Sequence, residues 1–155
     1  MTDKVFFTQA EIDRQLASIY RQMALQKYIP DAIVGITRGG LVPAVYISHY
    51  FNVPLYTINV SFRDTMIQGG IEQLLGLLES GKKVLVVDDI CDSGETLNFI
   101  HEKTSAVFDM NAIELRYAVL FHNEASKCSV LPDFIGVDIN KAEKDIWVCF
   151  PWEQN

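Results

Sequence analysis

The chain has 155 residues, of which 49% are hydrophobic, and this suits one domain with a single sizeable core. Its 13 basic and 20 acidic residues give a net charge of -7, which disfavours non-specific nucleic-acid binding, because such binding neutralises phosphates with Lys and Arg. No apolar run approaches the roughly 18 residues that a membrane-spanning helix needs, so no membrane partner is expected.

The cysteines, at positions 91, 128 and 149, have neither CxxC spacing nor a histidine at zinc-like intervals. The start, MTDKVFF, has no basic segment leading into an apolar stretch, so a secretory leader is not expected. An odd number of cysteines without a leader indicates reduced thiols, and we therefore expect a cytoplasmic protein.

The first predicted helix covers residues 8–26. Thr8 suits the N-cap, and Glu11, three residues later, completes a capping-box pattern. Hydrophobic residues then recur at helical spacing: Ile12, Leu16, Ile19 or Tyr20, and Met23.

Strands and helices alternate along the rest of the chain. Short apolar runs predict strands at residues 31–36, 54–60, 82–89 and 113–121, with at least one more around Trp147. Helical spacing predicts helices at residues 41–51, 71–81 and 95–108. The polar stretch 61–70, which holds a glycine pair, is expected to be an exposed loop. This alternation predicts an α/β fold in which helices flank a mostly parallel sheet.

Two unusual loops follow predicted strands. The first is TRGG at residues 37–40, and the second is DDICDSGET at residues 88–96. In parallel sheets, ligands bind beyond the carboxyl ends of the strands. The two loops are therefore the candidate functional site.

The segment VLVVDDICDSGETL (84–97) places Asp88 and Asp89 side by side after a buried apolar run. A response-regulator receiver also has paired acids at the end of its first strand. A receiver needs far more chain after that strand than the 66 residues that follow Asp89 in a chain of 155. No later strand ends in a lone phosphorylatable Asp, and the receiver interpretation therefore fails.

Asp88, Asp89 and Asp92 also match the DDxxD diphosphate motif of prenyl-transferring enzymes by letter. That motif lies on a long helix in an all-helical protein. In this chain the acids follow a β-branched apolar run, and Gly94 comes soon after them, so the local context excludes this interpretation.

A phosphorylated pentose suits the segment better. Acids at a strand end can bind vicinal sugar hydroxyls or a magnesium-bound ligand. The small residues after them open a helix and can wrap a phosphate with backbone N–H groups. The helix dipole favours such a phosphate by typically ~0.3–1 kcal/mol.

These residues resemble the phosphoribosyl diphosphate (PRPP) motif of type I phosphoribosyltransferases: four apolar residues, two acids, a short connector and a small-residue phosphate loop. GITRGGLVPA (35–44) is similar to the diphosphate loop of the bacterial 6-oxopurine (hypoxanthine/xanthine-guanine) subgroup. DIWVCFPWE (145–153) resembles the C-terminal base-binding segment of the same subgroup. The resemblance implies a single domain, 1–155, with a small C-terminal base-binding segment.

The resemblance implies transfer of ribose 5-phosphate from PRPP to a 6-oxopurine, hypoxanthine or guanine with xanthine as a further candidate. The expected products are a nucleoside monophosphate and diphosphate, and the expected role is purine salvage. Mg²⁺ is expected because PRPP carries dense negative charge, and the family usually forms homo-oligomers. Two alternatives stay open: the same chemistry on another base, and a PRPP-sensing regulator.

The resemblance also assigns roles to residues that bind PRPP and metal. Asp88 and Asp89 are expected to accept hydrogen bonds from the ribose hydroxyls. Together with Glu153 they are the expected metal residues. The loop 61–70 is expected to close over the site, and the peptide before Arg38 is expected to be strained or cis. The expected PRPP-binding residues are Arg38, Gly39, Ser61, Asp88, Asp89, Ser93, Gly94, Glu95 and Thr96.

Four further positions are expected to handle the base. Asp92 is the expected catalytic residue, which takes or holds a proton at purine N7. Trp147 is expected to stack on the purine, and Val148 to offer backbone groups to its edge. The subgroup places a Lys after the strand 113–121 as donor to the 6-oxo group. Here His122 stands at that position, with Lys127 as the alternative donor.

Overall fold

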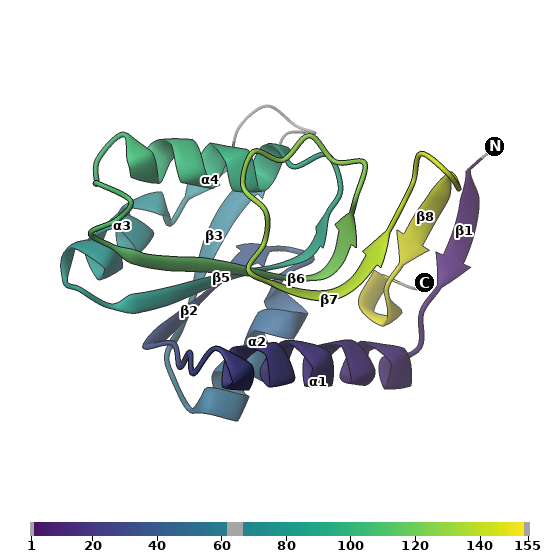
Figure 1. The fold of residues 1–155 in the computed structure, drawn as a ribbon, viewed down its shortest axis with the longest axis horizontal. Helices are drawn as coiled ribbons and strands as arrows, with labels where there is room; N and C mark the ends of the chain where they lie inside the picture. Colours follow the sequence, from purple (N-terminus) through teal and green to yellow (C-terminus); the bar gives the residue numbers. More distant parts are fainter. Residues whose placement is uncertain (1, 62–66, 154–155) are drawn as a thin grey trace.

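The computed structural model describes residues 2–61 and 67–153 and has an α/β architecture (Figure 1). Its main sheet has the strand order β4-β3-β2-β5-β6-β7. β4 runs antiparallel to β3, and the other neighbouring pairs are parallel, as predicted. The strands are β2 (Ala32–Thr37), β3 (Leu55–Ser61), β4 (Ile67–Gly69), β5 (Lys83–Cys91), β6 (Glu114–Asn123) and β7 (Phe134–Ile139).

Helices cover both faces of this sheet, as predicted. α1 (Gln9–Leu25) and α2 (Leu41–Phe51) lie on one face, and α3 (Ile71–Glu79) and α4 (Glu95–Ser105) lie on the other (Figure 1). Two expectations need correction. α4 ends three residues earlier than predicted, and part of the predicted loop 61–70 forms β4, because it pairs with the end of β3. Residues 62–66 of that loop lie outside the described residues.

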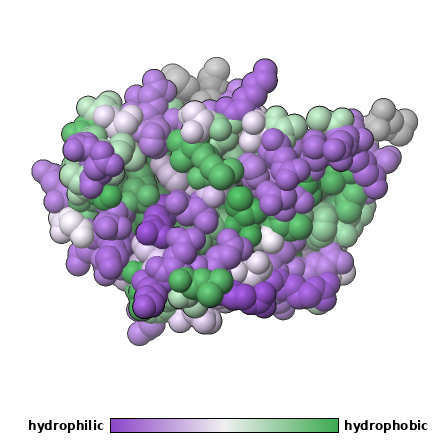
Figure 2. Space-filling model, viewed as in Figure 1, coloured by the Kyte–Doolittle hydropathy of each residue, from purple (hydrophilic) through white to green (hydrophobic). Residues whose placement is uncertain are grey.

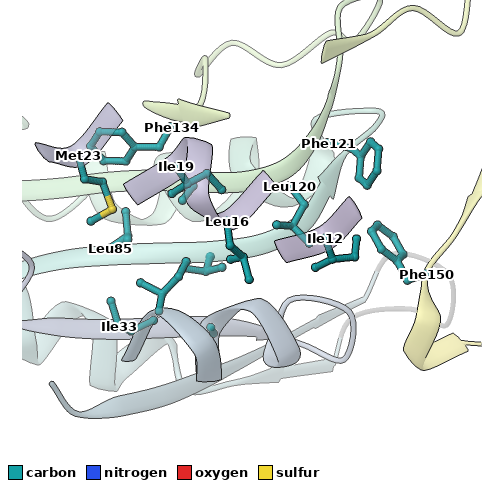
Figure 3. Packing of buried hydrophobic residues seen from close by; sticks show 14 of the residues in the cluster. Ile12, Leu16, Ile19, Met23, Ile33, Leu85, Leu120, Phe121, Phe134 and Phe150 are labelled. Atoms are coloured by element: carbon teal, nitrogen blue, oxygen red, sulfur yellow. The ribbon is translucent and has the colours of Figure 1, made fainter. Parts of the chain in front are cut away.

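The first helix begins with the capping box that the sequence predicts. The Glu11 N–H donates to Thr8 Oγ1 at 3.2 Å, and the Thr8 N–H donates to Glu11 Oε2 at 3.2 Å. These two bonds satisfy backbone donors that have no partner within the helix. The apolar stripe that follows faces the sheet. Figure 3 shows side chains of α1 gathered with those of β2, β5, β6 and β7 in one buried cluster.

The order of the strands reverses at one point in the main sheet, and open parallel sheets have a ligand-binding crevice at such a point. From β2 the chain moves outward to β3, and from β5 it moves in the opposite direction to β6 and β7. Ligands of open parallel sheets bind where the strand order reverses in this way. Here the reversal lies between β2 and β5, and each of these strands leads directly into one of the two loops singled out above.

A second, two-stranded parallel sheet lies beyond the ends of β6 and β7 (Figure 1). It pairs β1 (Asp3–Phe6) with β8 (Ile146–Cys149), and the 3-10 helix η1 (Pro151–Glu153) follows. Phe150 packs edge-on against Phe121 of β6, with ring centroids 5.5 Å apart. This contact fastens the small sheet to the core. β8 confirms the strand predicted around Trp147, whereas β1 was not predicted, because its four residues show no clear apolar alternation.

The surface is mixed in character. In Figure 2, polar side chains spread over the visible face, and hydrophobic side chains reach it in separate patches between them. Such exposed apolar atoms are ordinary on folded proteins. Within the described ranges, none of the helices has both the length and the apolar character that crossing a bilayer requires.

The capping box makes Thr8 a testable stabilising residue. Thr8→Ala is expected to lower the free energy of unfolding by about 1 kcal/mol, because the Glu11 N–H loses its side-chain acceptor and keeps only the Thr8 carbonyl. The melting temperature should fall by about 2–4 °C in thermal denaturation. Thr8→Ser, which keeps the hydroxyl, is the control and should melt close to the wild type. Equal losses for both variants would contradict the capping role.

Candidate functional site

Asp88 and Asp89 lie within β5, which was predicted to end at residue 89 and continues to Cys91. Pairing with β6 continues past them, through Ile90 opposite Phe121 and Cys91 opposite His122. The extra ladder hydrogen bonds hold both acids in extended backbone. The two carboxyl groups lie close enough to affect each other's pKa.

Asp89 is buried, Asp88 is half-buried at the pocket, and both carboxyl groups are poorly neutralised. Asp88 Oδ1 accepts from the Asp89 N–H at 2.9 Å, and Asp89 Oδ1 accepts from the Ile90 N–H at 2.7 Å. Burial raises the pKa of Asp88 well above its ordinary value, and the neighbouring Asp89 charge raises it further. Burial also raises the pKa of Asp89. Within residues 2–61 and 67–153, neither acid forms an ion pair.

The TRGG loop packs directly against this pair. A Cβ atom at Gly39 would lie 2.0 Å from Asp89 Oδ2, and one at Gly40 would lie 2.5 Å from the carbonyl oxygen of Val87. Only glycine allows the loop to approach this closely. The peptide between Thr37 and Arg38 is cis, as the resemblance implied. Arg38 is exposed beside the crevice and is able to reach an anionic ligand.

A pocket of about 270 Å³ opens at the end of β5. It is lined by Val60, Asp88 and residues 90–97, which include the whole predicted phosphate loop. Gly94 has a φ of 86°, and a Cβ there would lie 2.6 Å from the backbone of Cys128. The first turn of α4 borders the pocket, and its backbone N–H groups favour an anion. In the ligand-free protein, Ser93 Oγ accepts the Glu95 N–H at 3.4 Å.

Asp92 is held by two residues that the sequence did not single out. Lys141 Nζ lies 2.7 Å from Asp92 Oδ2, and Asn123 Nδ2 donates to Asp92 Oδ1 at 3.2 Å. Lys141 Nζ also lies 5.8 Å from the centre of the Trp147 ring. These contacts bring the predicted catalytic acid and the predicted stacking residue to the same place. No motif marks Lys141, because it lies in an ordinary polar loop between β7 and β8.

The other predicted base residues have mixed placements. His122 lies inside β6 and not after it, because β6 continues to Asn123. Its Nδ1 is 2.8 Å from Asp138 Oδ1 on the neighbouring strand, another residue missed in the sequence. Val148 is buried in β8, and Trp147 is 44% exposed. Lys127 is exposed, and its backbone carbonyl accepts from Asn98 Nδ2.

Of the three predicted metal residues, Asp88 and Asp89 are neighbours in β5, and Glu153 lies close enough to Asp89 to affect its pKa. Glu153 Oε2 accepts from the Phe150 N–H at 3.2 Å, and the charge of Glu153 contributes to the raised pKa of Asp89. Over the described ranges, no three His, Cys, Asp or Glu side chains gather closely enough to hold a metal. The remaining predicted PRPP contact, Ser61, concerns a side chain outside the described part of the chain.

Comparisons with known proteins match nearly the whole chain. The family described as phosphoribosyl transferase domain matches residues 6–153. A xanthine-guanine phosphoribosyltransferase of Idiomarina loihiensis is 30% identical over 147 residues, covering 92% of this chain and 80% of that relative. A purine phosphoribosyltransferase from Pyrococcus horikoshii is 32% identical with a TM-score of 0.73, covering 99% and 97% of the two chains. A Helicobacter pylori xanthine-guanine-hypoxanthine phosphoribosyltransferase shares the fold, with 20% identity, a TM-score of 0.73 and coverage of 97% and 93%.

Because the pKa of Asp88 is raised, replacing its carboxyl group with an amide is expected to stabilise the protein, by an amount that depends on pH. Burial favours the neutral acid in the folded protein, so wild-type stability is fully present below the ordinary pKa of about 3.9 and is lost as the pH rises through the raised pKa. Asp88→Asn is neutral at every pH and avoids this loss. The ligand-free variant should therefore melt above the wild type at pH 7.5, by about 2–4 °C per kcal/mol relieved.

The gain should shrink towards zero as the pH approaches 4, measured by thermal denaturation across the pH range. Glu143→Gln removes an exposed carboxylate and is the control, which should follow the wild type at every pH. A gain for Asp88→Asn that grows on acidification, or its absence at pH 7.5, would contradict the burial argument.

Proposed function

The chain belongs to the phosphoribosyltransferase family, and on that premise we propose that it transfers ribose 5-phosphate from PRPP to a 6-oxopurine base. The reaction releases diphosphate and forms a nucleoside monophosphate, a reaction of purine salvage. The whole chain, residues 1–155, acts as one catalytic domain. Two relatives support purines as the substrate class, since the Idiomarina protein and the Pyrococcus structure are both named for purine transfer.

The observation that carries the proposal is the convergence of three features on one crevice. A pair of acids without an ion-pair partner among the described residues lies in β5. The loop after β2 packs against this pair through its glycines. A pocket lies beside the first turn of α4, where backbone N–H groups are able to bind an anion. Hydroxyl donors suit the acids, and anions suit the two loops. PRPP has this combination of groups, with a diol, a 5-phosphate and a diphosphate.

The predicted PRPP contacts divide among these three features. Asp88 and Asp89 accept hydrogen bonds from the ribose hydroxyls, in addition to the one backbone N–H group that each already accepts. The loop 93–96 holds the 5-phosphate through backbone N–H groups and hydroxyls. Arg38 and Gly39 bind the diphosphate, Arg38 through its planar donors and Gly39 through its exposed backbone.

Mg²⁺ is the proposed metal. The adjacent carboxylates of β5 provide hard oxygen ligands, and Glu153 lies close enough to affect Asp89. In the described part of the chain, Asp88, Asp89 and Glu153 do not gather closely enough to hold a metal by themselves, so they would hold the ion only together with oxygens of PRPP. When bound, Mg²⁺ neutralises negative charge on the diphosphate leaving group.

The base site lies at the ends of β5, β6 and β8. Trp147 stacks on the purine and Val148 offers its backbone to the base edge, whereas His122 lies in β6 and contacts Asp138. Asp92 accepts the proton at N7 as the base nitrogen attacks the ribose and the bond to diphosphate breaks. The pocket holds the two reactants in place, and positioning supplies much of the rate enhancement.

Electrostatic stabilisation of the transition state supplies a further part of the rate enhancement. Charge separates between ribose and diphosphate in an oxocarbenium-like transition state. The carboxylates of Asp88 and Asp89 lie where positive charge develops on the ribose, and Arg38 lies where negative charge develops on the leaving group. Fixed charges in a partly buried site act without the reorganisation that water would need.

The setting of the enzyme follows from its chemistry and surface. The three cysteines carry free thiols, which suits action in the reducing cytoplasm. Several large apolar side chains are exposed, among them Leu25, Ile29 and Tyr50. We also propose a homo-oligomer, the usual state of the family, in which side chains of this kind would be covered.

An assay with radiolabelled PRPP and a panel of bases tests the proposal. Hypoxanthine, guanine or xanthine should yield labelled nucleoside monophosphate and diphosphate, and uracil should yield none. If PRPP binds but no base consumes it, the protein is a PRPP sensor and the proposal is wrong. Turnover with a pyrimidine alone would also contradict it.

Asp92→Asn is expected to lower kcat by roughly 10²–10⁴, as removal of a general acid–base group does. PRPP affinity should change far less, because Asp92 faces the base. Steady-state kinetics give kcat, and calorimetry with Mg²⁺ gives the PRPP affinity. An unchanged kcat would remove Asp92 from the catalytic role.

Arg38→Ala is expected to weaken PRPP binding by about 1.5–3 kcal/mol, the contribution of hydrogen bonds to charged groups. Diphosphate should lose a similar amount, whereas free-base binding should be nearly unchanged. Calorimetry with each ligand in Mg²⁺ buffer measures all three. Arg21→Ala, an exposed arginine of α1, is the control. Loss of base affinity together with unchanged PRPP affinity would exclude the diphosphate role.

A further inference from the structure

Lys141 occupies a position that the proposed roles leave unexplained. It lies in the loop between β7 and β8, yet its side chain is only 17% exposed. Long cationic side chains in loops usually extend into water, because burying an ammonium is unfavourable unless it is paired. A mostly buried lysine at the candidate base site therefore calls for a function.

The ammonium of Lys141 lies between the two residues assigned to the base. Its Nζ is 2.7 Å from Asp92 Oδ2 and 5.8 Å from the centre of the Trp147 ring. An ammonium within about 6 Å of an aromatic centroid is attracted to the ring. In the proposed binding mode, Asp92 contacts N7 of the base and Trp147 stacks on its face. The ammonium of Lys141 then lies beside the edge of the base that carries N7.

A buried amide sets the positions of both partners. Asn123 Oδ1 accepts the backbone N–H of Lys141 at 3.1 Å, while Asn123 Nδ2 donates to the carbonyl and carboxylate oxygens of Asp92 at 3.3 and 3.2 Å. The turn that carries Lys141 is also closed by bonds to Asn140, from the backbone N–H groups of Glu143 and Lys144. The Lys141–Asp92 spacing is therefore built into the fold by well-anchored backbone.

The chemistry of the purine edge gives this spacing a meaning. In a 6-oxopurine the atom group next to N7 is O6, a hydrogen-bond acceptor, whereas adenine has an amino donor there. An ammonium has three donors and no acceptor. A cation beside the acid that meets N7 is therefore complementary to a 6-oxopurine. Against adenine it would set one donor against another.

His122 and Lys127, the two O6 donors predicted from the sequence, are placed less well than Lys141 to contact the base. His122 already engages Asp138 through Nδ1 at 2.8 Å. Lys127 is exposed, in a loop whose backbone is bound by Asn98 of α4. Lys141 has both the charge and a direct contact with Asp92.

We propose that Lys141 is the specificity-determining residue of this site, with its ammonium donating to O6 of the base. The inference rests on the proposed function, since it names the group that selects among purines in that reaction. It places the O6 donor on the β7–β8 loop, and not on the strand β6 or the segment directly after it.

The test compares Lys141→Gln with Lys144→Gln, the same chemical change at an exposed lysine three residues later. Both variants and the wild type are assayed with PRPP and either hypoxanthine or adenine, with enough enzyme to measure the slower base. Lys141→Gln should lower kcat/KM for hypoxanthine roughly 10- to 100-fold, the equivalent of one charged hydrogen bond. The value for adenine should fall far less, and Lys144→Gln should match the wild type.

A second variant, Lys141→Arg, guards against misfolding of the first. It keeps a cationic donor beside Asp92 and should retain most of the preference for hypoxanthine. Thermal denaturation of each variant, with PRPP affinity by calorimetry, confirms that the fold and the PRPP site are intact.

Several results would overturn the inference. Equal losses for hypoxanthine and adenine in Lys141→Gln would mean that Lys141 only positions Asp92, because both bases carry N7. Unchanged discrimination in Lys141→Gln, with discrimination lost in His122→Ala, would assign the O6 contact to His122. A wild type that transfers no purine at all would refute the proposed function itself, a failure that the wild-type assay alone reveals.

Discussion

Two adjacent carboxylates of the central strand, one buried and one half-buried, are the constraint on which the site depends. Ionised acids away from water are unfavourable unless a donor or cation compensates them. Within the described ranges, Asp88 and Asp89 have backbone N–H groups and no ion pair, and burial raises the pKa of both. The protein therefore keeps a local electrostatic strain that a diol and a metal-bound polyanion would relieve. Gly39 is part of the same constraint, because any side chain there would meet the Asp89 carboxylate.

The parallel sheet explains how distant segments share this site. β2, β5, β6 and β7 run in the same direction, so the loops after them meet at the same edge. Asn123 then joins three of these loops through its hydrogen bonds to Asp92, Ala125 and Lys141. One buried amide thus transmits the geometry of the sheet to Asp92, the proposed catalytic acid, and to Lys141, which contacts it. The small β1–β8 sheet completes the base side, since Phe150 packs on Phe121 of β6.

Local patterns in the sequence were enough for the alternating elements, the capping box at Thr8 and the loops at residues 37–40 and 88–96. Each of these depends on neighbours within a few positions. The pattern failed where long-range pairing decides. β1 is a strand because it pairs with β8, which lies near the other end of the chain. β4 is a strand because it folds back and pairs with the end of β3. β5 and β6 run past their predicted ends at residues 89 and 121 because they pair with each other, and so His122 lies inside a strand. Lys141 and Asp138 carry no local signal, since their partners come from other strands.

The most direct test of the account is a crystal structure of the protein with Mg²⁺ and PRPP. The account predicts ribose hydroxyls within hydrogen-bonding distance of the Asp88 and Asp89 carboxylates. It also predicts the 5-phosphate on the backbone of residues 93–96, and the diphosphate beside Arg38 and Gly39. A ligand bound with its 5-phosphate at the Arg38 loop, or with its ribose away from the two acids, would contradict it.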